Sequence, residues 1–94
     1  MKSESKIQTE IVKYLKKEGH WVIKVMRANE NGCPDLLCCL NNGKFIAIEV
    51  KTGYNKPSEW QKKHINKIND IGGLAICAWS LDEVKSFVTG VLEI

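Results

Sequence analysis

Three charged residues stand at the ends of two short apolar segments, and their types and spacing suit a divalent-metal site. Asp35 opens one segment, and Glu49 and Lys51 lie at the end of the next. Two facing carboxylates repel each other, and a divalent cation between them removes the repulsion; oxygen ligands of this kind suit Mg²⁺. Lys51 follows Glu49 by two residues, so on a strand both side chains lie on one face, where the ammonium can hold a water molecule or a phosphate oxygen.

The same residues also fit a plainer arrangement. Charges at the ends of two strands are often only solvated, and a same-face pair such as Glu49 and Lys51 then contributes less than about 1 kcal/mol to stability. Taken alone, the three residues leave both interpretations open.

A hairpin is the element that must position these residues. Residues 35–40 and 44–51 are apolar runs joined by Asn41-Asn42-Gly43, and an Asn-Gly turn between such runs is a strong hairpin signal. Counting outward from the turn places Asp35 opposite or nearly opposite Glu49, so the carboxylates are expected to converge.

The first helix is predicted over residues 4–18, with Ser3 as its N-cap and Gly19 at its end. Its apolar residues recur at helical spacing, and Glu4 and Gln8 lie on that same inward side, while Glu10 lies at the edge. A carboxylate on the inward face needs a partner or a function.

The remaining elements follow from periodicity and capping signals. A strand over residues 21–26 precedes a polar loop over 27–32; Ser58 begins a helix to about residue 70, with Gln61 completing a capping box. The inward residues predicted for that helix are Gln61, His64, Ile65, Ile68 and Ile71. A buried strand over 74–79 and a last short helix from Ser80 come next, with residues 91–94 as an edge strand. The order is α-β-β-β-α-β-α, in one α/β domain spanning residues 1–94.

Composition narrows the class of protein. The 94 residues carry a net charge of +3, with 44% hydrophobic and 27% charged residues, which is typical of a globular domain and permits a polyanionic partner. No segment is long and apolar enough to span a membrane, and no signal peptide is present, so we expect a soluble protein of the cytoplasm of a bacterial or phage-infected host cell. The four cysteines lack paired metal-ligand spacing and are predicted to be reduced, mostly buried thiols.

Several short motifs in a fixed order resemble one nuclease superfamily. They are Glu4-Ser5-x-x-Gln8, Gly32-x-Pro34-Asp35-Leu36, Glu49-Val50-Lys51-Thr52, Ser58-x-x-Gln61 and Gly72-Gly73. Together they resemble the PD-(D/E)XK superfamily, and in particular the small stand-alone phage and bacterial members of its VRR-NUC family. The resemblance implies a restriction-endonuclease-like core, with a mixed β-sheet and flanking helices.

The resemblance also implies the roles of the site residues. Asp35 and Glu49 would bind Mg²⁺ or Mn²⁺ together with the carbonyl of Val50 and a carboxylate of the first helix, for which Glu4 is preferred to Glu10. Lys51 would lie beside the attacking water. Gln8 would bind a metal-bound water or a phosphate, or simply be an exposed helix residue, and Gln61 would contact the site or only cap its helix. His64 is expected to be a packed helix residue.

The resulting functional prediction is a Mg²⁺-dependent endonuclease that hydrolyses DNA phosphodiester bonds, on branched or four-way-junction DNA, as a homodimer with two sites. Two alternatives remain. One is a structure-specific DNA-binding module that has lost catalysis. The other is a metal-independent RNA-processing nuclease of related fold that would use His20, Tyr54 and Lys51. Trp60 is predicted either to stack on a nucleobase or to pack in the core or a dimer interface, and the roles of Trp21 and Trp79 are left open.

Overall fold

The sheet of the computed structural model, which describes residues Met1–Ile94, contains four strands in chain order. They are β1 (Trp21–Lys24), β2 (Leu36–Cys39), β3 (Phe45–Val50) and β4 (Leu74–Ala78). β1, β2 and β3 are antiparallel neighbours, whereas β4 runs parallel to β3. The mixed sheet and the α-β-β-β-α-β-α order of the sequence prediction are therefore confirmed.

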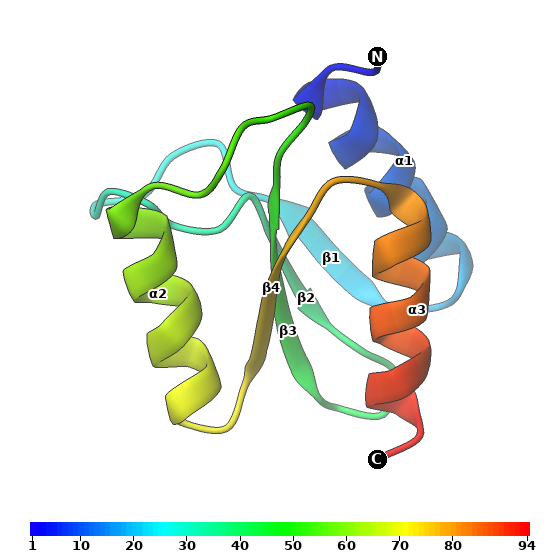
Figure 1. The fold of residues 1–94 in the computed structure, drawn as a ribbon. Coiled ribbons are helices and arrows are strands. Elements are labelled where there is room, and N and C mark those ends of the chain that lie inside the picture. The colour runs from blue at the N-terminus through cyan, green and yellow to red at the C-terminus, as the bar shows by residue number, and fades with distance from the viewer.

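Three helices cover the two faces of this sheet (Figure 1). α1 (Glu4–Lys17) and α3 (Leu81–Leu92) pack on one face and against each other, and α2 (Glu59–Asp70) packs on the other face over β3 and β4. Because α2 packs over β3 and β4 only, the β1–β2 half of this face of the sheet is left open. Trp21 and Ile23 of β1 are 56% and 43% exposed there, and Phe45, at the adjoining end of β3, is 42% exposed.

The core lies between the sheet and the pair α1 and α3. The largest fully buried side chains on this side come from α1, β2, β3 and α3: Ile11, Leu15, Leu36, Ile46, Ile48, Val50, Val84 and Val88. The alternation of β3 sends its even-numbered residues into this core and directs Phe45, Ala47 and Glu49 toward α2. Ala47 and Glu49 are buried as well, because β3 lies between β2 and β4 and helices cover both faces of the sheet there.

Three details of the sequence prediction were wrong. Residues 91–94 do not form an edge strand, because α3 continues to Leu92 and Val84, Val88 and Val91 keep one buried face at helical spacing. Ile71 is 71% exposed, since α2 ends at Asp70 before that residue can turn inward. The first strand ends at Lys24 rather than at residue 26.

All four cysteines are free thiols, as predicted, but only Cys38 is buried, so the expectation that most of them are buried was wrong. Cys39 is exposed because it lies on the face of the sheet opposite the core. No helix in the structure is both long and apolar enough to cross a membrane.

Candidate active site

Asp35 and Glu49 come together through the β2–β3 register. Leu36 pairs with Ile48, so the next position outward from the turn places Asp35 against Glu49. Asp35 is held on both sides. Its Oδ2 accepts a hydrogen bond from the Val50 N–H at 2.8 Å, and its carbonyl accepts one from the Val25 N–H at 2.8 Å. The predicted convergence of the two carboxylates is confirmed.

Glu49 is a buried carboxylate with an incomplete set of partners. Its side chain is only 2% exposed, and its Oε2 accepts a hydrogen bond from Gln61 Nε2 at 2.9 Å and lies 3.5 Å from Lys51 Nζ. Its other oxygen, Oε1, is buried without any hydrogen-bond partner. Burial, reinforced by the neighbouring Asp35 and opposed by Lys51, raises the pKa of Glu49 to about 7.

Lys51 is fixed one residue beyond the end of β3. Its N–H donates to the Ala78 carbonyl at 3.0 Å, which continues the pairing of β3 with β4 past Val50. The side chain is 14% exposed, so the ammonium is partly desolvated beside Glu49. The predicted same-face arrangement of Glu49 and Lys51 is present.

Gln61 performs both of the tasks that the sequence left open. Its Oε1 accepts a hydrogen bond from the Ser58 N–H at 2.8 Å, and its N–H donates to Ser58 Oγ at 3.2 Å, which completes the capping box of α2. Its Nε2 then remains free to donate to Glu49. One amide therefore fixes both the start of α2 and the orientation of the buried carboxylate.

The helix carboxylate is not part of this group. Glu4 Oε2 accepts a hydrogen bond from Asn55 Nδ2 at 3.3 Å, and Glu10 pairs with Lys2 at 2.8 Å. No three acidic, cysteine or histidine side chains lie close enough together to hold a metal ion. The structure thus brings together two of the predicted carboxylate ligands, Asp35 and Glu49, and does not bring Glu4 to them.

Gln8 is buried at 8% exposure, so it is not the exposed helix residue of the plainer alternative. It forms no side-chain hydrogen bond within the protein, and its binding role stays a prediction.

The alternative site of His20, Tyr54 and Lys51 is not assembled. His20 is buried beside the hairpin turn, where its Nδ1 accepts a hydrogen bond from the Asn41 N–H at 2.9 Å. That turn and Lys51 lie at opposite ends of β3. Tyr54 is fully exposed.

His64 is half-buried and holds a loop. Its Nε2 lies 2.9 Å from the Asn31 carbonyl and 3.7 Å from Glu30 Oε1, which ties α2 to the segment that leads to Asp35. His64 therefore contacts a loop rather than packing into the core, and its structural rather than catalytic role stays a prediction.

Asn55 was missed by the sequence prediction. Its side chain donates to Glu4, and its carbonyl accepts a hydrogen bond from Trp79 Nε1 at 3.0 Å, so it links α1 to the residue after β4. Residues in irregular loops follow no periodic pattern that could predict their contacts. The only signal in the sequence was that Asn55 lies in the polar loop directly after the Glu49-Val50-Lys51 motif.

The donor set fits a divalent cation. Two carboxylates on adjacent strands provide the oxygen ligands that Mg²⁺ and Mn²⁺ prefer, and the unpartnered Oε1 of Glu49 is a buried acceptor that a cation would satisfy. Val50 lies at the same strand end, with its N–H already bound to Asp35.

A sequence comparison decides the family. The profile of the VRR-NUC domain matches residues 1–80, which include every site residue described above. The chain belongs to the VRR-NUC family. This VRR-NUC domain is accordingly a nuclease domain, and α3 lies entirely beyond the matched residues.

Individual relatives agree with this assignment. The VRR-NUC domain is 30% identical over 79 residues to the protein named "Putative nuclease p44" of Acyrthosiphon pisum secondary endosymbiont phage 1, covering 84% of this chain and 85% of that protein. Among solved structures, it resembles a "VRR_NUC domain" with a TM-score of 0.80 at 24% identity, covering 92% of this chain and 94% of that one. A "VRR_NUC domain protein" gives 0.79 at 20% identity, covering 94% and 86%. These structures support the same fold.

Proposed function

We propose that this VRR-NUC domain is a Mg²⁺- or Mn²⁺-dependent endonuclease that hydrolyses phosphodiester bonds of DNA. The observation that carries the proposal is the buried Glu49 carboxylate, which faces Asp35, has an unpartnered oxygen and lies 3.5 Å from the Lys51 ammonium. A structural ion pair does not require a second carboxylate against it. A cation and a phosphate together would satisfy all three groups.

Some residues of the site would bind the cation, and Lys51 would stabilise the charge that develops during hydrolysis. Asp35, Glu49 and the Val50 carbonyl would hold the cation, which when bound would polarise the phosphate and acidify a water molecule. Lys51 orients the nucleophile or neutralises the charge that develops on the phosphate oxygens. Gln61 holds Glu49 in one orientation, and the Val50 N–H does the same for Asp35. By family resemblance, the products carry 5′-phosphates.

We further propose a homodimer that acts on branched or four-way-junction DNA. A chain of 94 residues has little surface with which to grip a duplex, and specific DNA interfaces bury about 1,000 Å² or more of protein. The open half of the sheet supports a self-contact, because Trp21 and Phe45 both stand opposite Cys39 in the strand register and form one exposed apolar row.

One experiment tests the activity. Linear, flapped, nicked and four-way-junction DNAs are incubated with the protein in Mg²⁺, Mn²⁺ or EDTA, with Lys51→Ala as the matched control. We expect nicking in either metal, none in EDTA, and faster cleavage of the branched substrates. Binding of these DNAs without any cleavage in metal would instead identify an inactive binding module, and cleavage in EDTA would exclude a metal-dependent mechanism.

A further inference from the structure

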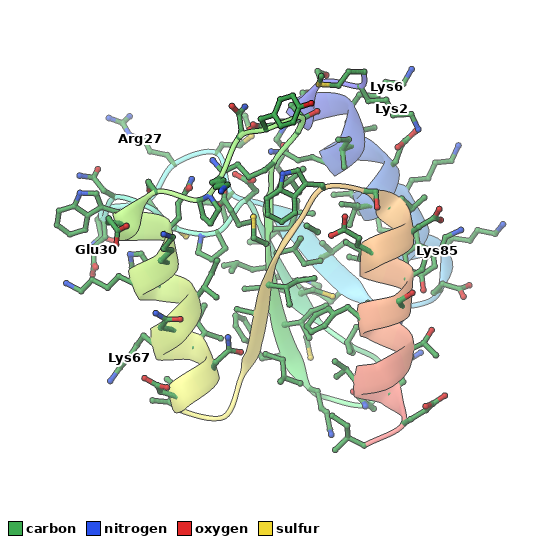
Figure 2. All side chains as sticks on the ribbon, in the orientation of Figure 1. Lys2, Lys6, Arg27, Glu30, Lys67 and Lys85 are labelled. Atoms are coloured by element: carbon green, nitrogen blue, oxygen red, sulfur yellow. The ribbon has the colours of Figure 1, made fainter.

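A stripe of one aromatic and two basic residues runs along the outer side of α2. Trp60, Lys63 and Lys67 are spaced at i, i+3 and i+7, so they lie on one face of the helix. Figure 2 shows Lys67 pointing away from the sheet on this side, with Glu30 near the N-terminal end of the helix. We call these three residues the α2 track.

The track begins at the active site. Trp60 directly precedes Gln61, whose amide contacts Glu49. It is also packed against Gly32, three residues before Asp35: a Cβ on Gly32 would lie 2.5 Å from the Trp60 carbonyl carbon and 2.7 Å from its Cβ. The backbone and Cβ of Trp60 are therefore fixed between the loop that leads to Asp35 and the start of α2, which carries Gln61.

The side chain of Trp60 is nevertheless free to bind. It is 56% exposed, and unlike Trp79 it forms no hydrogen bond through its indole nitrogen. The Lys63 ammonium lies 5.4 Å from the ring centre, which places a positive charge against the aromatic surface. An exposed indole beside a cation suits a nucleobase with its adjoining phosphate.

The charges along the track are also available. Three acids lie near these lysines: Glu59 contacts Lys62 at 3.3 Å, Glu30 lies 3.7 Å from His64, and Asp70 forms no salt bridge. Lys63 and Lys67 take part in no salt bridge, and both line an open hollow of about 740 Å³ along the helix. Two unpaired ammonium groups one helical turn apart can follow a phosphate backbone.

We propose that the α2 track binds a single-stranded segment of the DNA substrate, with an unpaired base stacked on Trp60 and the following phosphates bound by Lys63 and Lys67. This proposal rests on the proposed function and extends it, because it assigns the substrate an unpaired stretch next to the cleaved bond. Bases within an intact duplex present no face to an indole at the helix surface.

Binding in EDTA tests the base contact without cleavage. Fluorescence anisotropy would measure the affinity of labelled dT20 and of a hairpin duplex for Trp60→Leu and Trp60→Phe. Both variants keep the Cβ that packs on Gly32, and only Phe keeps an aromatic face. We expect Trp60→Leu to weaken dT20 binding about tenfold and duplex binding less than twofold, and Trp60→Phe to restore most of the loss.

Salt dependence tests the phosphate contacts. The double variant K63Q/K67Q should reduce the slope of log affinity against log salt for dT20 by about 1.4, since each phosphate contact contributes about 0.7 on single strands. The matched control K13Q/K16Q, which removes the same charge from exposed positions of α1, should change this slope much less.

Any of four results would contradict the proposed binding at the α2 track. The wild type could fail to bind dT20 measurably, or Trp60→Leu and Trp60→Phe could bind it with equal affinity. Trp60→Leu could lose as much affinity for the duplex as for dT20, or K63Q/K67Q and K13Q/K16Q could give equal salt slopes. Cleavage of DNA in Mg²⁺ is scored separately on the same preparations. Its absence would refute the proposed nuclease activity, and its presence together with any of these binding results would refute only the track.

Discussion

Lys51 is the residue whose removal should separate binding from cleavage. Its ammonium lies beside Glu49 at 3.5 Å, yet its backbone, not its side chain, links β3 to β4. Lys51→Ala should therefore retain the fold and DNA binding and lose at least about 10²-fold in cleavage rate, which is typical for the loss of a positioned charge. Circular dichroism, anisotropy and single-turnover cleavage measure the three properties, with exposed Lys56→Ala as control. Near-normal cleavage by folded Lys51→Ala would exclude its role.

Glu49 should make the metal-free protein less stable as the pH rises. Its pKa of about 7 in the folded state exceeds the ordinary value of 4.5, so between these pH values the folded state binds more protons than the unfolded state. The free energy of unfolding then falls from pH 4.5 to above 7, by up to about 3 kcal/mol.

The matched variants remove this effect. Glu49→Gln and Asp35→Asn should each melt higher than the wild type in EDTA at pH 8, and neither should be stabilised by Mn²⁺, which should stabilise the wild type. Chemical denaturation in EDTA across this pH range and titration calorimetry with Mn²⁺ are the measurements. A flat wild-type profile, or wild-type metal affinity in both variants, would contradict the uncompensated carboxylate pair.

Much of the site was predictable because a local element builds it. The Asn-Gly turn sets the register of β2 and β3, so simple counting placed Asp35 against Glu49. The place of Glu4 was not predictable in this way. Its inward phase on α1 was correct, but the contact it makes depends on Asn55, a loop residue whose position no periodicity determines.

At the scale of elements, the start of α2 couples helix stability to the site, and two variants can separate these functions. Ser58→Ala removes the cap oxygen but leaves the Gln61 amide near Glu49, so it should lower the free energy of unfolding by about 1 kcal/mol with little change in cleavage. Gln61→Ala removes both interactions and should also lower cleavage about tenfold. Equal cleavage by the two variants would show that Gln61 is only a capping residue.

The elements themselves were predicted where hydrophobic periodicity was strong. Capping residues Ser3, Ser58 and Ser80 all accept the hydrogen bonds expected of them. The failure at residues 91–94 has a tertiary cause: a β-branched Val91 near the chain end favours a strand locally, but its burial beside Val84 and Val88 favours the helix.

At the scale of the whole molecule, the open half of the sheet predicts how two copies meet. Trp21→Glu places a charge in the exposed apolar row and should convert a dimer to a monomer in light scattering at micromolar concentration, with the fold retained because Trp21 is 56% exposed. Leu92→Glu, at a 39% exposed position on α3, is the control and should remain dimeric. A monomeric wild type, or a dimer that Trp21→Glu leaves intact, would exclude this interface.

The hairpin that carries Asp35 and Glu49 also has a consequence for folding kinetics. A short turn joins β2 to β3, whereas the whole of α2 lies between β3 and β4 in the chain. The β2–β3 pairing, which brings the two carboxylates together, is therefore more local in sequence than the β3–β4 pairing. Their repulsion then acts before Gln61 arrives to orient Glu49. At pH 8 in EDTA, Asp35→Asn should refold faster than the wild type in stopped-flow experiments, with a smaller change in the unfolding rate. If the rate change fell mainly on unfolding, the carboxylates would meet late, together with the docking of α2.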